Sequence, residues 1–198
     1  INKIVIIISA RILFCLSCSS DADLIMKKPR ALTVGDTIAF CAPSGFLDSI
    51  RMSLAKTRLE EKGFYIVRED SIYRRWGYLA GTDAQRAIEL MSYFKDKSVR
   101  AIFPGTGGYG STRILSILDY DIIKNNPKIF IGFSDITGLH SALNQIANLV
   151  TFHTPNPMYG LGSKGGLEPM AETYFWSLLK GNDEIYQIPF DLYGDSLR

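Results

Sequence analysis

The feature that most constrains the fold of this chain is a repeated alternation of apolar runs and amphipathic segments from Thr33 onward. Each run is rich in β-branched and aromatic residues, and the segment after it has helical spacing. The predicted strands are residues 37–42, 64–67, 99–103, 128–133 and 149–152, and the predicted helices are 47–62, 82–95, 111–118, 135–147 and 168–180. Strands that are apolar throughout and separated by helices indicate an α/β fold, with a mostly parallel sheet flanked by helices on both faces.

The length of 198 residues, 46% of them hydrophobic, suffices for one ordinary domain. We interpret residues 1–25 as a leader or a spurious upstream segment, 26–180 as the α/β domain, and 181–198 as the start of a linker to a missing C-terminal domain. The apolar run near the start is too short to span a bilayer, and Arg11 interrupts it. We therefore expect a cytoplasmic protein, with an exported or lipid-anchored one as the alternative if residues 1–18 are a working signal.

Charge and cysteine content exclude several classes of partner. The 22 basic and 20 acidic residues give a net charge of +2, which offers no electrostatic reason to expect nucleic acid or a membrane surface. Cys15, Cys18 and Cys41 lie too far along the chain from either histidine to suggest a zinc site, and Cys41 is expected to be a buried thiol. We expect neither a disulfide framework nor a metal site.

A ligand of such a sheet binds beyond the carboxyl ends of the strands, where the turns at 43–45, 104–110 and 132–135 should meet. In the second turn, Gly105, Gly107 and Gly110 match the dinucleotide-binding spacing G-x-G-x-x-G. Two strand-helix units precede this turn, however, and Tyr109 is bulky for a phosphate site. A nucleotide-binding module and a merely tight turn both remain open at this point.

The third turn, "GFSD", places Ser134 between a strand and a helix, with Gly132 two residues earlier. This is the setting of a nucleophile elbow, and the N–H groups at the start of the helix could hold an oxyanion. The motif departs from G-x-S-x-G because Ile136 stands where the second glycine would be. Ser134 could instead be a helix N-cap. Ser44, in "APSG", is a rival nucleophile with the same alternative.

Five segments together resemble a known family: "GDTIAFCAPSG", "LAGTDAQRAIEL", "GTGGYGSTRILSILDYDII", "NPKIFIGFSDITGLHSAL" and "TFHTPNP". They are similar, in order over about residues 29–180, to LD-carboxypeptidases (muramoyltetrapeptide carboxypeptidases), a family that includes the microcin C self-immunity peptidases. The resemblance implies the N-terminal part of a two-domain serine peptidase without a metal or organic cofactor. Such an enzyme releases the terminal D-alanine of murein tetrapeptides during cell-wall recycling.

The resemblance also implies roles for individual residues. Ser134 would be the nucleophile, the backbone N–H groups of Asp135 and Gly108 would form the oxyanion hole, and Gly107 and Tyr109 would contact the substrate. The partner would be a murein peptide or a peptide-like small molecule, and a homodimer of the complete protein stays open.

The chain departs from the family pattern in two ways. Thr106 stands where many members have an arginine, which puts the substrate preference in question. The Glu and His of the Ser-His-Glu arrangement would belong to the C-terminal domain, so this chain alone is expected to be inactive. We interpret His140 as a surface or core histidine and His153 as a hydrogen-bonded loop histidine rather than as a base. A catalytically silent peptide-binding domain remains an alternative.

Overall fold

The computed structural model describes residues 25–68 and 70–181. The interpretations of residues 1–24 and 182–198 as leader and linker, and Cys15 and Cys18, lie outside these residues. Five strands pair in parallel in the order β2-β1-β3-β4-β5. They are β1 (Thr37–Cys41), β2 (Tyr65–Val67), β3 (Val99–Pro104), β4 (Ile129–Gly132) and β5 (Phe152–His153). The predicted parallel α/β sheet is confirmed.

In the part of the chain that the structure describes, five α-helices and three 3₁₀ helices connect and cover the strands. The α-helices are α1 (Ser49–Glu61), α2 (Asp83–Lys95), α3 (Tyr120–Asn125), α4 (Thr137–Gln145) and α5 (Pro169–Leu179). The 3₁₀ helices are η2 (Asp70–Tyr73), η3 (Ser111–Ile117) and η4 (Ser134–Ile136). Side-chain oxygens accept backbone N–H groups at the N-termini of four α-helices, and the capping residues are Asp48, Thr82, Asp119 and Glu168.

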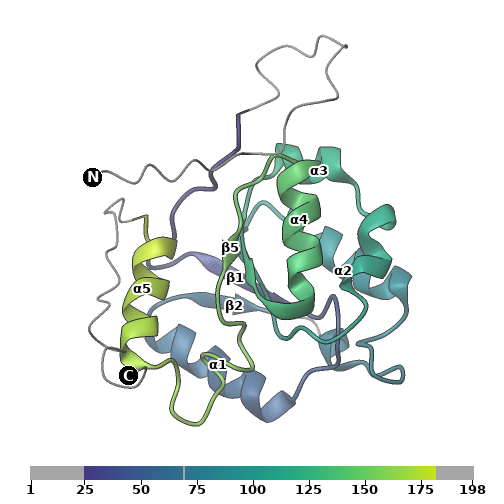
Figure 1. The fold of residues 1–198 in the computed structure, drawn as a ribbon. Helices are drawn as coiled ribbons and strands as arrows, with labels where there is room; N and C mark the ends of the chain where they lie inside the picture. Colours follow the sequence, from purple (N-terminus) through teal and green to yellow (C-terminus); the bar gives the residue numbers. More distant parts are fainter. Residues whose placement is uncertain (1–24, 69, 182–198) are drawn as a thin grey trace, which may run out of the picture.

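Two hydrophobic cores lie on opposite faces of the sheet. Side chains of β1 alternate between them: Ile38 and Phe40 pack with α1 and α5, whereas Ala39 and Cys41 pack with α2, α3 and α4. Figure 1 shows these two groups of helices on either side of the strands. Cys41 is fully buried, as predicted, and burial raises the pKa of its thiol. The sheet is thus a rigid platform for the turns at its carboxyl edge.

Three local predictions differ from the structure. Residues 111–117 form the 3₁₀ helix η3 rather than an α-helix, and the helix predicted from Asp135 begins as η4. Helix α3 was not predicted; it begins because the carboxylate of Asp119 accepts the Ile122 N–H at 3.0 Å. Leu149, predicted as strand, forms only an isolated bridge with Lys27, and the paired residues are Phe152 and His153.

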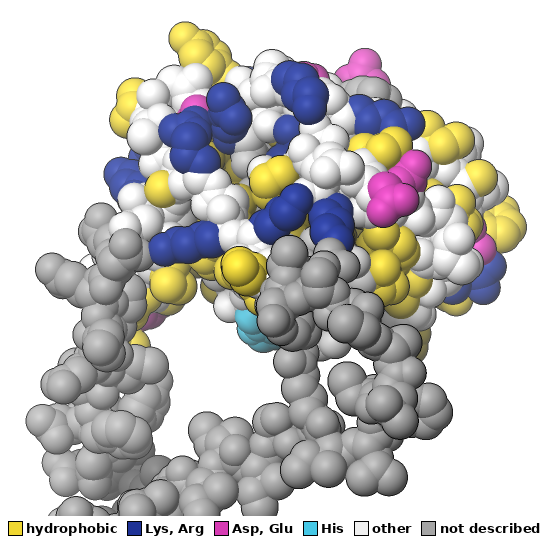
Figure 2. Space-filling view, turned by 90° about the horizontal axis from the view of Figure 1, so that it is seen from above, with side chains coloured by type: hydrophobic (Ala, Val, Ile, Leu, Met, Phe, Trp, Pro, Cys, Tyr) yellow, Lys and Arg dark blue, Asp and Glu magenta, His cyan; other side chains and the backbone are white. Residues whose placement is uncertain are grey.

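Basic side chains gather on one face of the molecule, shown from above in Figure 2. Several basic residues lie near the amino ends of the strands. Lys27 bonds to the Lys124 carbonyl, Lys97 to the side-chain amide of Asn126, and Arg100 pairs with Asp36. Within the described parts of the chain, no helix is long and apolar enough to cross a membrane. The turns predicted to carry the site lie at the opposite, carboxyl edge.

Candidate active site

Ser134 stands in the turn between β4 and α4 with a backbone φ of +62°. Only glycine adopts this left-handed region without cost, and a strained non-glycine residue in such a turn is typical of functional sites. Ser134 is exposed, and its side chain caps neither η4 nor α4, whose N-cap residues are Phe133 and Ile136. The N-cap interpretation of Ser134 is therefore wrong, whereas the predicted strand-turn-helix setting is observed.

The turn at residues 104–110, called the glycine loop below, approaches the Ser134 turn closely. A Cβ atom on Gly107 would lie 3.0 Å from the Cβ of Ser134 and 3.2 Å from the amide nitrogen of Asp135. The Gly107 carbonyl accepts the N–H of Gly45 at 3.1 Å. The side-chain amide of Asn156 also contacts this loop. Oriented so that its nitrogen donates to the Gly105 carbonyl, its oxygen accepts from the Gly107 N–H at 3.2 Å. The three turns predicted to meet at the carboxyl edge do meet, and Gly107 lies at the point of contact.

Two backbone N–H groups beside Gly107 are available to a ligand. Within residues 25–68 and 70–181, neither the amide of Asp135 nor that of Gly108 donates to a protein acceptor. Gly108 is exposed at a φ of +120°, a conformation that L side chains rarely adopt. Tyr109, next to it, is 77% exposed. Unpaired N–H groups next to an exposed hydroxyl are the elements of an oxyanion hole.

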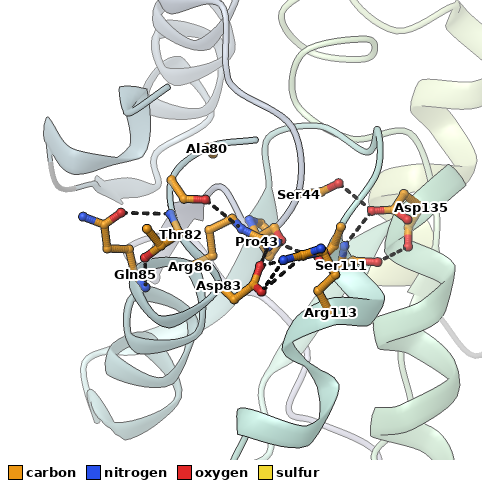
Figure 3. A network of polar contacts seen from close by, with 12 residues as sticks. Pro43, Ser44, Ala80, Thr82, Asp83, Gln85, Arg86, Ser111, Arg113 and Asp135 are labelled. Atoms are coloured by element: carbon orange, nitrogen blue, oxygen red, sulfur yellow. Dashed lines mark hydrogen bonds and ion pairs between the residues drawn. The ribbon is translucent and has the colours of Figure 1, made fainter. Parts of the chain in front are cut away.

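Ser44 has a different environment from Ser134. It is fully buried, and its Oγ donates to Oδ2 of Asp135 at 2.5 Å (Figure 3). Helix α1 is capped by Asp48, so the N-cap interpretation of Ser44 is wrong as well. A buried hydroxyl that is already bonded to a carboxylate cannot reach a substrate, which leaves Ser134 as the accessible serine of the two turns.

The two histidines occupy different positions. His140 is 6% exposed; its Nε2 lies 2.9 Å from the Gly132 carbonyl, and its Nδ1 has no partner in the described residues. Burial lowers the pKa of His140, so the neutral ring donates from Nε2 and supports the strand just before the Ser134 turn. His140 is thus a core histidine, one of the two roles expected from sequence. His153 is exposed at the end of β5.

A cavity of about 340 Å³ opens beside the Ser134 turn. Its lining is mainly apolar, and the residues that form it are Phe133, His153, Thr154, Pro155 and Tyr159. No group of His, Cys, Asp and Glu side chains with metal-binding geometry occurs in the part of the chain that the structure describes. The site therefore combines an exposed serine, two free amides and an apolar pocket, which suits the binding of a peptide carbonyl.

A family model described as the LD-carboxypeptidase N-terminal domain matches residues 38–154. The chain belongs to the LD-carboxypeptidase family. It is 41% identical over 159 residues to the "Probable murein peptide carboxypeptidase" of Bacillus subtilis strain 168, covering 80% of this chain and 50% of that protein. This chain thus spans about half the length of the curated relatives that it matches.

Solved structures of this family have the same fold. A structure of microcin C7 self-immunity protein MccF in complex with aspartyl sulfamoyl adenosine superposes with a TM-score of 0.76 at 30% identity, covering 81% of this chain and 50% of that one. Muramoyltetrapeptide carboxypeptidase from Oxalobacter formigenes gives a TM-score of 0.65 at 26% identity, covering 72% and 47%. The similarity to about half of each structure is consistent with an N-terminal domain.

The LD-carboxypeptidase fold also accounts for the glycine spacing without a nucleotide. A Cβ on Gly105 would lie 2.7 Å from the side chain of Leu47, and one on Gly110 would lie 2.5 Å from that of Leu79. The loop leads into η3, whereas the dinucleotide fingerprint requires the N-terminus of an α-helix. Thr106, in the same loop, is buried at 7% exposure.

The motifs missed two side chains that support this site, because Asp135 was predicted only for its backbone N–H. Arg86 is fully buried, although its side chain is charged, and the carboxylate of Asp135 receives hydrogen bonds from two other turns. One sequence signal was available for Arg86: it falls on the same face of α2 as the buried Leu90. A charged residue on the apolar face of a helix indicates a buried polar network.

Proposed function

We propose that this chain is the nucleophile-bearing half of a serine LD-carboxypeptidase that releases the terminal D-alanine of murein tetrapeptides. The observation that carries the proposal is the exposed Ser134 at a φ of +62°, with the free amides of Asp135 and Gly108 nearby. The name of the Bacillus subtilis relative supports the substrate class. We call the protein that also has the C-terminal half found in its relatives the complete enzyme.

In the proposed reaction, Oγ of Ser134 attacks the carbonyl carbon of the bond between an L-centre and D-alanine. A base accepts the hydroxyl proton, and the carbonyl oxygen becomes an oxyanion that the amides of Asp135 and Gly108 stabilise. The carbon–nitrogen bond then breaks, and D-alanine leaves with a proton returned by the base. Water hydrolyses the resulting ester of Ser134 by the reverse sequence of proton transfers. Gly107 and Tyr109 would border the bound peptide.

The base is proposed to come from the C-terminal half. His140 is engaged with the Gly132 carbonyl and buried, so it is poorly placed to accept a proton from Ser134. The family resemblance assigns the base and its orienting group to a His and a Glu outside the residues present here. The 198-residue chain would then bind peptide without turning it over.

The experiment compares two murein tetrapeptides that differ only in the configuration of the terminal alanine. The complete enzyme should release D-alanine at least about 10²-fold faster than L-alanine, because an inverted centre misplaces the scissile carbonyl relative to Ser134. Equal rates would refute the L,D specificity. Stoichiometric peptide binding without release of either alanine would instead support a silent binding domain.

The similarity to MccF favours one second candidate substrate. Because an MccF structure contains aspartyl sulfamoyl adenosine, an aminoacyl sulfamoyl nucleotide should be assayed beside the tetrapeptide. A kcat/KM for that compound above the value for the tetrapeptide would transfer the proposal to the self-immunity type of substrate.

A further inference from the structure

The side chain of Asp135 ties together the three turns at the carboxyl edge of the sheet. Its Oδ2 accepts the hydroxyl of Ser44 at 2.5 Å and the backbone N–H of Ser111 at 2.9 Å (Figure 3). The backbone carbonyl of Asp135 also accepts the hydroxyl of Ser111 at 2.5 Å. Ser44 belongs to the first turn and Ser111 follows the glycine loop. A single residue next to Ser134 therefore bonds to both neighbouring turns.

A buried cation holds the same two turns from the other side. The guanidinium of Arg86 donates to the carbonyl of Pro43 and, at 2.8 Å, to that of Gly110. These residues directly precede Ser44 and Ser111, so the dipeptides Pro43-Ser44 and Gly110-Ser111 each link Arg86 to Asp135. Figure 3 shows Pro43, Ser44 and Ser111 between the side chains of Arg86 and Asp135. Burial lowers the pKa of Arg86, and the hydrogen bond from its guanidinium to Asp83 opposes that effect. Bonds on both sides leave the turns little freedom to move relative to each other.

The first turn, residues 43–45, also supports Gly108. A Cβ on Gly108 would lie 3.4 Å from Cα of Gly45 and 3.6 Å from Oγ of Ser44, so the backbone of Gly108 rests on this turn. The Gly45 N–H also donates to the Gly107 carbonyl. A displacement of Ser44 would therefore move Gly108, one of the two free amides of the site.

We propose that Asp135 is a positioning residue that fixes the separation of the two oxyanion donors. Its side chain restrains its own amide and, through Ser44 and Ser111, the glycine loop that carries the amide of Gly108. The proposal rests on the function proposed above, in which both amides stabilise the oxyanion. It assigns the carboxylate no proton transfer and no contact with the substrate.

The kinetic test separates hydrogen bonding from charge in the complete enzyme. Asp135→Ala should lower kcat about 10²-fold, as loss of an oxyanion donor typically does, with less than a threefold change in KM. Asp135→Asn should stay within tenfold of wild type, because its Oδ1 can accept both hydrogen bonds. Ser44→Ala should fall between them. Asp119→Ala, which removes the cap of α3 away from the site, is the control for general destabilisation.

The proposal is refuted if Asp135→Ala keeps wild-type kcat, or if Asp135→Asn is as impaired as Asp135→Ala. The second result would mean that the charge, not the hydrogen bonds, is needed.

A second measurement does not depend on activity. Because the Ser111 N–H donates to Asp135, its hydrogen exchange should accelerate at least tenfold in Asp135→Ala but not in Asp135→Asn or Asp119→Ala. Unchanged exchange in Asp135→Ala would overturn the positioning role whatever the kinetics. If the wild-type enzyme releases no D-alanine, the proposed function fails, and the exchange rates still decide whether Asp135 holds the glycine loop.

Discussion

The left-handed backbone of Ser134 predicts an unusual response to glycine. At a φ of +62°, any residue with a Cβ is strained by roughly 1–2 kcal/mol, and glycine is not. Glycine also loses more conformational freedom on folding, which offsets about 0.5–1 kcal/mol of that gain relative to alanine. Ser134→Gly should therefore be more stable than Ser134→Ala by about 0.5–1 kcal/mol.

Ser141 provides the matched control. It is an exposed serine in α4, and its hydroxyl bonds to the Thr137 carbonyl at 3.0 Å. In this regular helix, Ser141→Gly should be less stable than Ser141→Ala by about 1 kcal/mol. The glycine-minus-alanine difference thus changes sign between the two positions. Subtracting one from the other cancels most of the conformational entropy of glycine, so the remaining difference of about 1.5–2 kcal/mol mainly reports the backbone strain at Ser134.

The assay is thermal unfolding of the four variants of the complete enzyme, followed by circular dichroism at one pH. For the unfolding of an N-terminal domain of about 150–250 residues within that enzyme, about 1 kcal/mol corresponds to roughly 2–4 °C in Tm. If Ser134→Gly melts below Ser134→Ala by as much as Ser141→Gly melts below Ser141→Ala, Ser134 is not strained and the elbow argument is refuted.

Three further predictions concern the fold and the catalytic base. The 198-residue chain alone should release D-alanine at less than about one thousandth of the rate of the complete enzyme; comparable release that is lost in His153→Ala would show that the base lies within it. Arg86→Met should destabilise by about 3 kcal/mol because it leaves the buried carbonyls of Pro43 and Gly81 unpaired, whereas Arg113→Met, which removes only an exposed partner of Asp83, should barely change Tm. Burial lowers the pKa of His140 below its ordinary 6.5, so as pH falls the unfolded chain binds the proton before the folded chain does. The contribution of neutral His140 to the free energy of unfolding is therefore complete above pH 6.5 and decreases as pH falls below it. An NMR titration of His140 with a midpoint at or above 6.5 would contradict this, and His140→Gln should flatten the acid loss of Tm.

The sequence predicted the strand-helix alternation because each strand is apolar throughout and ends at a turn. It also predicted that three turns would meet, since carboxyl ends of parallel strands share one edge. The sequence did not distinguish residues whose local sequence patterns are the same but whose roles differ. A serine after a strand looks like an N-cap or a nucleophile, and only the tertiary contacts distinguish Ser44, buried on Asp135, from the exposed Ser134.

The polar network could not be predicted from motifs for the same reason. Arg86, Ser44, Ser111 and Asp135 come from separate segments, and each residue type alone is common at a protein surface. Their pairing depends on the register of β1, β3 and β4, which brings the turns after these strands together. Short-range propensity does not determine such long-range contacts.

The measurement that tests the central claim most directly is the rate of D-alanine release by Ser134→Ala in the complete enzyme. Loss of a serine nucleophile removes on the order of 10⁶-fold in kcat in a serine protease, so release should fall to background while the circular dichroism spectrum and Tm stay close to those of wild type. Ser141→Ala should retain wild-type activity. A folded Ser134→Ala enzyme that releases D-alanine within tenfold of the wild-type rate would contradict the assignment of Ser134 and the mechanism built on it.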